Sequence, residues 1–258
     1  MSEFLKIEKD GYILNVTLNR PERRNALSTP ICEGLLELPA FVESDINIRC
    51  VIFSGEGEGF CSGADLKERK ELNQEMGWKY VELVDRALLS VEKIPVPVIA
   101  AINGHALGGG TELALGCDLR LAVANADFGL TETGIGIIPT GSIVRLLRDG
   151  HDGLSSLLTY TAARFSAHRM QEMGFLHQVV NTLDELGELA TVLAEQIVLN
   201  APLALRAAKR VKWELAAQQT TKAMDIAESI RRTLDNTADC AEGLAAFAEK
   251  RTPVFIGQ

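Results

Sequence analysis

A buried apolar run that passes through a cluster of glycines into a helix is the feature that most constrains how this chain folds. Residues 97–102 (PVIAAI) have the composition of a buried strand. Residues 103–110 (NGHALGGG) follow at once, and residues 111–115 predict the start of a helix. Glycines at such a junction let the backbone approach a ligand closely, and the first N–H groups of a helix favour a bound oxyanion. The segment therefore predicts a strand-to-helix connection with a ligand site beside it.

Strands and helices alternate along most of the chain. Asp10-Gly11 is a two-residue turn signal between two extended runs, which predicts a hairpin. Alternation of the two element types is typical of the α/β class. Strands are expected over residues 4–9, 12–19, 49–54, 97–102 and 118–124, and helices from about residue 29 and over residues 75–93 and 111–115.

After about residue 182 the pattern changes to helices alone. Helical segments are expected over residues 182–199, 202–218, 220–235 and 237–250, with no strand between them. Their alanine-rich apolar stripes need a partner surface. We therefore expect a core domain at residues 1–195 and a helical C-terminal oligomerisation region at residues 196–258.

Charge narrows the range of partners. The 258 residues carry a formal net charge of −9. Binding to nucleic acid or to an anionic membrane through bulk charge is disfavoured, because phosphate contacts need clustered cations. We expect neither a nucleic acid nor a membrane as a partner. An anionic substrate would instead need a local cluster of positive charge or of backbone N–H donors.

The cysteines and the apolar segments bear on the cellular compartment. Five cysteines, an odd number with no CxxC spacing, argue against a disulfide framework and against a zinc site. The N-terminus has no basic start followed by an apolar stretch, so no signal peptide is visible. The most apolar region, residues 94–107, is too short to span a bilayer. We therefore expect a cytoplasmic protein.

Common catalytic and nucleotide-binding motifs are missing from the sequence. It holds no GxxxxGK[ST], and the glycines at 104–110 and 134–136 do not form GxGxxG. Ser62 is not within GxSxG, which disfavours a hydrolase elbow. The four histidines form neither HxxxH nor HExxH, so we interpret each as a surface or core residue.

Two glutamates stand beside the candidate loops. Glu112 falls in the first turn of the helix after the glycines. Glu132 follows another short predicted strand, in residues 128–132 (FGLTE). Taken alone, Glu112 could simply stabilise a helix N-terminus, and Glu132 could be an ordinary loop or cap charge. The residues by themselves leave these interpretations open.

Five blocks of sequence stand in order along the chain: residues 19–28 (NRPERRNALS), 60–66 (FCSGADL), 97–118 (PVIAAINGHALGGGTELALGCD), 129–139 (GLTETGIGIIP) and 242–255 (EGLAAFAEKRTPVF). Together they resemble the crotonase superfamily, that is, the enoyl-CoA hydratase/isomerase family, and the resemblance covers nearly the whole chain. It implies an α/β crotonase-like spiral of ββα units with a C-terminal all-helical trimerisation region, an acyl-CoA thioester substrate, and a homotrimer or dimer of trimers. No cofactor is expected, since coenzyme A is part of the substrate.

The resemblance also implies roles for individual residues. The backbone N–H groups of Ala64 and Gly109 would form an oxyanion hole, and Glu112 and Glu132 would be the catalytic glutamates. Further substrate or CoA contacts are implied for Arg23, Arg24, Ala26, Ser62, Gly63, Asp65, Leu66 and Gly108, with Phe247 and Lys250 at the adenine and phosphate of CoA.

Hydration needs both kinds of group. Addition of water to a 2-enoyl thioester places negative charge on the thioester oxygen, which two preorganised N–H donors stabilise. One carboxylate can deprotonate the water while the other supplies a proton to C2. The presence of both glutamates therefore favours enoyl-CoA hydratase activity, or the reverse dehydration.

Other functions stay open at this point. A double-bond isomerase of the same family needs only one glutamate, at position 132, to move a proton between C2 and C4. A hydrolase or C–C lyase on the same scaffold is a weaker alternative. A non-catalytic RNA-binding relative is disfavoured by the net charge of −9. Thr140 and Ile143 stand where the family often has glycines, in a loop close to the acyl pocket.

Overall fold

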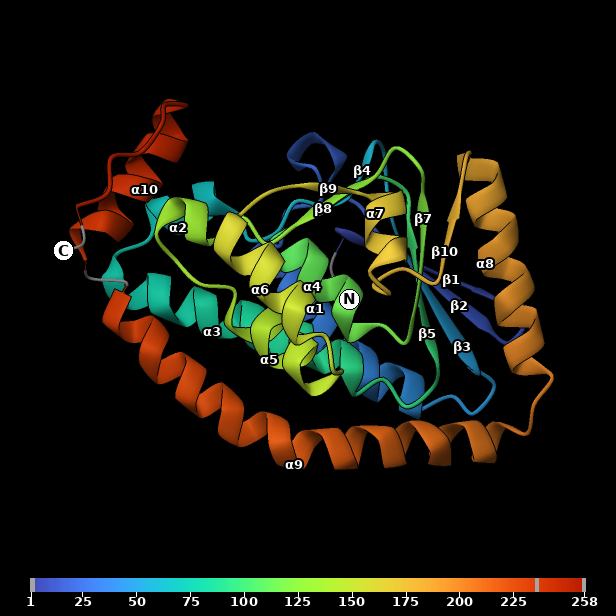
Figure 1. Cartoon of the computed structure of the whole chain (residues 1–258). Helices are drawn as coiled ribbons and strands as arrows, with labels where there is room; N and C mark the ends of the chain where they lie inside the picture. The colour runs from blue at the N-terminus through green and yellow to red at the C-terminus, as the bar shows by residue number, and fades with distance from the viewer. Residues whose placement is uncertain (1–2, 235–236, 257–258) are drawn as a thin grey trace. The chain divides into compact units, whose positions relative to one another are not determined.

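The computed structural model describes residues 3–234 and 237–256 (Figure 1). The chain divides into two compact units. The first comprises Met1–Phe128 and Phe165–Glu214, and the second comprises Gly129–Arg164 and Leu215–Gln258. The domain boundary expected at residue 195 stays a prediction.

A six-stranded sheet forms the centre of the first unit, in the order β1-β2-β3-β5-β7-β10. Only the first pair is antiparallel; the other neighbours run parallel. The predicted hairpin is confirmed, but Asp10 pairs with Ile13, so the two loop residues are Gly11 and Tyr12. Gly11 has a φ of +54°, which glycine adopts without strain. The strands are Leu5–Asp10, Ile13–Leu18, Cys50–Gly55, Val98–Ile102, Leu119–Val123 and Gln178–Val180.

A second sheet of four short strands has the order β4-β6-β8-β9. These strands are Gly59–Cys61, His105–Leu107, Asp127–Gly129 and Phe165–Ser166. Three times, a strand of the large sheet is followed along the chain by a strand of the small one: β3 by β4, β5 by β6, and β7 by β8. Helices then follow β4 and β6, so the α/β class and the expected ββα repetition are confirmed.

Helices lie on both sides of the large sheet. Helix α8 packs on β3, β5 and β7, while α3 packs on α1 and α4. Figure 1 shows α8 on one side of the sheet and α1 and α4 on the other. Pro30 stands in the first turn of α1, where its fixed φ suits the start of a helix. The helices of this unit are α1 Thr29–Glu43, α2 Leu66–Glu71, α3 Gln74–Glu92, α4 Gly109–Gly116, α7 Ala167–Glu172 and α8 Leu183–Val198.

The second unit is helical. It contains α5 Thr140–Arg148, α6 Asp152–Thr161, α10 Ala238–Glu249 and the short 3-10 helix η2, Thr133–Ile135. The last helix matches the segment predicted over residues 237–250. Thr140, which departs from the glycine-rich family pattern, is the first residue of α5 and is buried.

One prediction for the tail is wrong. The helices expected over residues 202–218 and 220–235 are a single helix of 33 residues, α9, Pro202–Leu234. Residues 218–221 (QQTT) contain neither glycine nor proline, and threonine costs a helix only tenths of a kcal/mol. Residue 235 lies outside the described residues. Among the residues described, no single helix is both long enough and apolar enough to cross a membrane. The segments Leu183–Val198 and Pro202–Leu215, with a bend of 105° between them, are long and apolar enough only when taken together.

All five cysteines are buried and none is in a disulfide. Burial raises the pKa of Cys50, Cys61 and Cys117 to about 12. In the described part of the chain, no group of three or more His, Cys, Asp or Glu side chains is arranged to hold a metal ion.

Candidate active site

The loop after β4 lies against the N-terminus of α4. A Cβ atom built on Gly63 would fall 3.1 Å from the backbone N of Gly109 and 2.8 Å from the carbonyl O of Leu107. A Cβ built on Gly109 would fall 3.6 Å from the backbone N of Ala64. The amide groups of Ala64 and Gly109 are therefore close neighbours, as the resemblance implies.

Both amide groups have hydrogen-bonding capacity to spare. Gly109 is the first residue of α4, so its N–H has no partner within the helix. Within residues 3–234 and 237–256, neither the N–H of Ala64 nor that of Gly109 donates a hydrogen bond to the protein. Both residues are half-buried, whereas Gly63 and Gly108 on either side are buried. Two adjacent donors at a helix N-terminus can bind an oxygen that carries negative charge.

Glycine is needed at several positions for this close approach. Gly63 and Gly108 have φ values of +90° and +53°, a region that side chains rarely allow. A Cβ on Gly110 would lie 2.0 Å from the carbonyl O of Cys61, which no packing adjustment of a side chain can relieve. The glycine cluster therefore brings α4 against β4 and leaves the amides exposed between them.

Glu112 is the fourth residue of α4. Its side chain is only 5% exposed. A carboxylate that served only to stabilise a helix N-terminus would do so from the surface, since burial of a charge is costly. Glu112 is therefore a buried carboxyl group in the first turn of α4, which makes it a candidate catalytic acid or base.

Glu132 belongs to the second unit. It follows β8 and caps η2, with its carbonyl accepting from the N–H groups of Ile135 and Ile137. Its Oε2 atom is buried. The loop is tightly held, because a Cβ on Gly136 would lie 2.7 Å from the Cα of Cys240 in α10. The hydroxyl of Thr133 also donates to the carbonyl of Thr159 in α6, at 2.6 Å.

The stretch around Arg23 and Arg24 is joined to the Ser62 loop. The N–H of Ser62 donates to the carbonyl of Arg24 at 3.0 Å, and the Ser62 hydroxyl donates to the carbonyl of Arg23 at 3.4 Å. Both arginine side chains are exposed, while Ala26 is buried. The structure thus brings two of the predicted CoA-binding stretches together within the first unit.

Asn25 is a residue of this stretch that sequence reasoning did not single out. Its side chain is fully buried and its φ is +54°. The side-chain amide donates to the carbonyls of Glu56 and Gly59, at 3.0 and 2.8 Å, and Oδ1 accepts the N–H of Arg20 at 2.9 Å. Asparagine tolerates this backbone conformation better than most residues, which is the one signal that could have marked it.

The carboxylate of Asp65 is engaged within the protein. One oxygen accepts the N–H groups of Lys67 and Glu68 at the start of α2, and the other pairs with Arg20 at 2.6 Å. Burial acts to raise the pKa of Asp65, but the Arg20 guanidinium and the backbone donors lower it below its usual value. The side chain therefore anchors the loop, and Leu66, which begins α2, is half-buried beside it.

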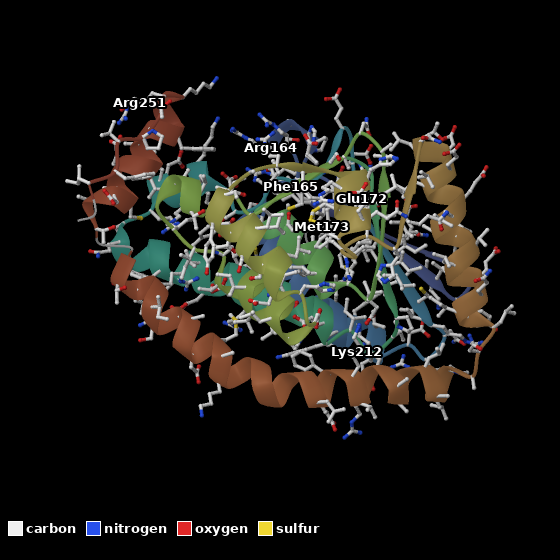
Figure 2. The ribbon with its side chains drawn as sticks, in the orientation of Figure 1. Arg164, Phe165, Glu172, Met173, Lys212 and Arg251 are labelled. Atoms are coloured by element: carbon white, nitrogen blue, oxygen red, sulfur yellow. The ribbon has the colours of Figure 1, made fainter. Side chains whose placement is uncertain are left out.

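Phe247 and Lys250 lie on α10 in the second unit. The Phe247 side chain is 57% exposed. Lys250 ends the helix with a φ of +56° and is exposed. The next residue, Arg251, labelled in Figure 2, pairs with Glu242 at 2.5 Å and with Glu249 at 2.6 Å.

Comparisons with known proteins agree on one family. The family model described as enoyl-CoA hydratase/isomerase matches residues 8–258. The Bacillus subtilis protein YngF is 41% identical, with 96% of each chain covered. The short-chain-enoyl-CoA hydratase of Clostridium acetobutylicum is 36% identical, covering 95% of this chain and 94% of that protein. A crystal structure of an enoyl-CoA hydratase from Bacillus anthracis is similar with a TM-score of 0.78 and 38% identity, covering 99% of this chain and 100% of the other.

Proposed function

This chain belongs to the enoyl-CoA hydratase/isomerase family, and we propose that it adds water across the double bond of a trans-2-enoyl-CoA to give a 3-hydroxyacyl-CoA, or catalyses the reverse dehydration. It is an enzyme of the hydratase type. The observation that carries the proposal is the pair of adjacent amide donors, Ala64 and Gly109, one helical turn from the buried Glu112. Coenzyme A enters as part of the substrate, and the chemistry needs no further cofactor.

The amide pair would bind the thioester oxygen. When water attacks C3, electron density moves through C2 onto that oxygen, and an enolate-like state forms. Both N–H groups are fixed before the reaction, so they stabilise this charge without reorganising. Removal of one such donor typically costs ~10²–10³ in kcat.

The two glutamates would handle the protons. One carboxylate accepts a proton from the attacking water, and the other, in its protonated form, supplies the proton that C2 receives. We assign these two roles to Glu112 and Glu132.

The CoA part of the substrate would bind at exposed residues. The face of Phe247 is available to stack on the adenine. The Lys250 ammonium is available to pair with a phosphate. Arg23 and Arg24 are exposed cations in the stretch that is tied to Ser62. The segment from Ser62 to Leu66 and the glycines 108–109 would line the thioester end.

We expect this protein to form a homotrimer or a dimer of trimers in the cytoplasm, with neither nucleic acid nor membrane as partner. Exposed apolar residues on α9, Leu203 and Val211, support assembly, since such side chains on one helix face are usually covered. A mass in solution equal to a single chain of 28.0 kDa would contradict it.

A double-bond isomerase is the second candidate, because proton transfer between C2 and C4 could use Glu132 alone. The burial of Glu112 at the amide site favours the hydratase, since an isomerase has no use for it. The test is a panel of 2-enoyl-CoA esters of varied chain length and branching. Loss of the conjugated thioester absorbance supports hydration. No loss with any of them, together with turnover of a 3-enoyl-CoA, would replace the hydratase by the isomerase.

A further inference from the structure

The peptide group that contains the Ala64 N–H and the peptide group that follows it are both held by hydrogen bonds from outside the loop. On one side, the carbonyl of Gly63 accepts the N–H of Leu27 at 2.8 Å. On the other side, the N–H of Asp65 donates to the phenolic oxygen of Tyr80 at 2.7 Å. Tyr80 lies on α3, and Leu27 lies just before α1.

The Tyr80 hydroxyl joins these two supports. It accepts from Asp65 and donates to the carbonyl of Leu27 at 2.5 Å. The direct bond from the Asp65 N–H to the same carbonyl is longer, at 3.4 Å. The tyrosine side chain is only 3% exposed. A single buried hydroxyl group therefore bridges the Leu27 backbone and the loop that contains Ala64.

The planar geometry of the peptide group, together with these contacts, sets the direction in which the Ala64 N–H points. In a planar trans peptide the carbonyl and the N–H point opposite ways. Because Leu27 holds the Gly63 carbonyl, the Ala64 N–H points away from Leu27. The orientation of that peptide then depends on how firmly the Leu27 backbone and the Asp65 N–H are fixed, and Tyr80 contacts both.

We propose that Tyr80 is a positioning residue for the hydration, which aims the Ala64 N–H at the thioester oxygen by clamping the loop to Leu27. The inference rests on the function proposed above. Tyr80 does not contact the substrate in this scheme; it acts through the backbone of residues 63–65. It would therefore contribute to kcat rather than to CoA binding, since an aimed donor matters most when charge develops on the oxygen.

The hydrogen bond that Tyr80 donates does not titrate near neutral pH. Burial raises the pKa of Tyr80 well above its usual value. The hydroxyl thus keeps its proton and continues to donate to the Leu27 carbonyl.

The test compares Tyr80→Phe with Tyr160→Phe in the full-length enzyme. Tyr160 is 82% exposed, so removal of its hydroxyl group takes away only contacts with water. For Tyr80→Phe we expect kcat to fall about 10-fold with KM within about twofold, a part of the ~10²–10³ lost when an oxyanion donor is removed. Tyr160→Phe should match wild type in both constants.

Infrared difference spectra of a bound saturated acyl-CoA, which cannot react, report the donors directly. Hydrogen bonds lower the stretching frequency of the thioester carbonyl. We expect the carbonyl frequency of the thioester to be lower when it is bound to wild type than when it is free in water. The decrease should be smaller when it is bound to Tyr80→Phe. If Tyr80→Phe reduces only the melting temperature, with kcat and carbonyl frequency unchanged, the inference is overturned while the hydratase stands.

A second variant covers the case in which Tyr80→Phe does not fold. Site-specific 3,5-difluorotyrosine at position 80 retains the ring and the hydroxyl, but its oxygen accepts the Asp65 N–H more weakly. The shift of the carbonyl frequency should then shrink relative to wild type, and an unchanged shift would overturn the inference. Failure of wild type to hydrate any enoyl-CoA would instead remove the proposed function itself.

Discussion

Asp118 and Lys209 form a buried ion pair although 91 residues separate them in the sequence. Asp118 directly precedes β7, and Lys209 lies on α9. Lys212, labelled in Figure 2, adds a second ammonium at 3.0 Å from Asp118, and the N–H of Val98 donates to the same carboxylate at 2.9 Å. The start of α9 is therefore attached to the central sheet of the first unit through one carboxylate.

This pair makes the stability of the fold depend on pH. Burial acts to raise the pKa of Asp118, but the charges and hydrogen bonds of Lys209 and Lys212 outweigh it and lower the pKa. The stabilisation is therefore complete above the unfolded-state pKa of about 3.9 and is lost as the pH falls through the lower folded-state value. Denaturant melts of wild type should show a decline in the free energy of unfolding below about pH 4.

Asp118→Asn should remove this component and lower the stability at pH 7 by about 3–5 kcal/mol, because it leaves Lys209 buried without a counter-charge. The matched control is Glu56→Gln, since Glu56 pairs with Lys6 on the surface with both side chains more than two-fifths exposed. That change should lower the free energy of unfolding by less than about 1 kcal/mol. Equal effects of the two variants would show that the Asp118 pair contributes no more than a surface pair.

The catalytic glutamates can be separated by exchange for glutamine, which keeps the shape but cannot transfer a proton at neutral pH. Glu112→Gln and Glu132→Gln should each lower the hydratase kcat by at least ~10², while KM changes less. The double variant should be little worse than the poorer single one, because the two groups act as a unit. Glu33→Gln on the exposed face of α1 is the control. Near-wild-type hydration by Glu112→Gln would leave Glu112 with a structural role at the helix N-terminus.

Two strands of the large sheet, β3 and β5, could be predicted from the sequence because they are parallel strands buried on both faces, whereas β10, Gln178–Val180, was not predicted. Residues 50–53 and 98–102 are accordingly unbroken apolar runs. Three strands of the small sheet, β4, β6 and β9, could not be predicted, because they have only two or three residues each and show no periodicity. The prediction of two helices in place of α9 was wrong because a polar stretch was taken for a helix end, although it contains no residue that stops a helix.

The candidate site was predictable where it depends on glycine. Gly63 and Gly110 mark close backbone approaches and Gly108 has a φ of +53°, and together they identify the amide pair. The support from Tyr80 was not predictable, since a tyrosine on the apolar face of a helix has the pattern of any core residue. Its partners, Asp65 and Leu27, lie 15 and 53 residues away along the chain. Only the folded structure brings the three together.

Recognition of CoA can be tested at Lys250. Lys250→Ala should raise KM and leave kcat nearly unchanged, because a phosphate contact is equally strong in the ground and transition states. The increase in KM should shrink at high salt, since exposed ion pairs are screened. Lys9→Ala, on β1, removes another exposed cation and should change neither constant. Equal turnover of a short pantetheine thioester by wild type would show that the nucleotide half is not recognised.

The close approach of α4 to β4 predicts opposite effects for two glycine substitutions. Gly110→Ala would place a Cβ 2.0 Å from the backbone of Cys61, so it should destabilise the protein by about 3 kcal/mol or more. Gly187→Ala lies within α8 with no atom within 4 Å of the new methyl group. It should stabilise by about 0.5–1 kcal/mol, because alanine is the better helix former. Thermal or denaturant melts measure both, and a harmless Gly110→Ala would contradict the packing described.

The donors proposed for the thioester oxygen belong to the main chain, and this limits how mutation can reach them. No replacement of the Ala64 side chain deletes its N–H; only proline would, and the same holds for Gly109. Each glutamate, by contrast, is lost through a single codon change. During divergence, the capacity to bind the oxygen of an acyl-CoA would therefore outlast any particular arrangement of acids and bases. Descendants of such a gene could exchange one reaction for another without first having to rebuild the place where the substrate carbonyl is held.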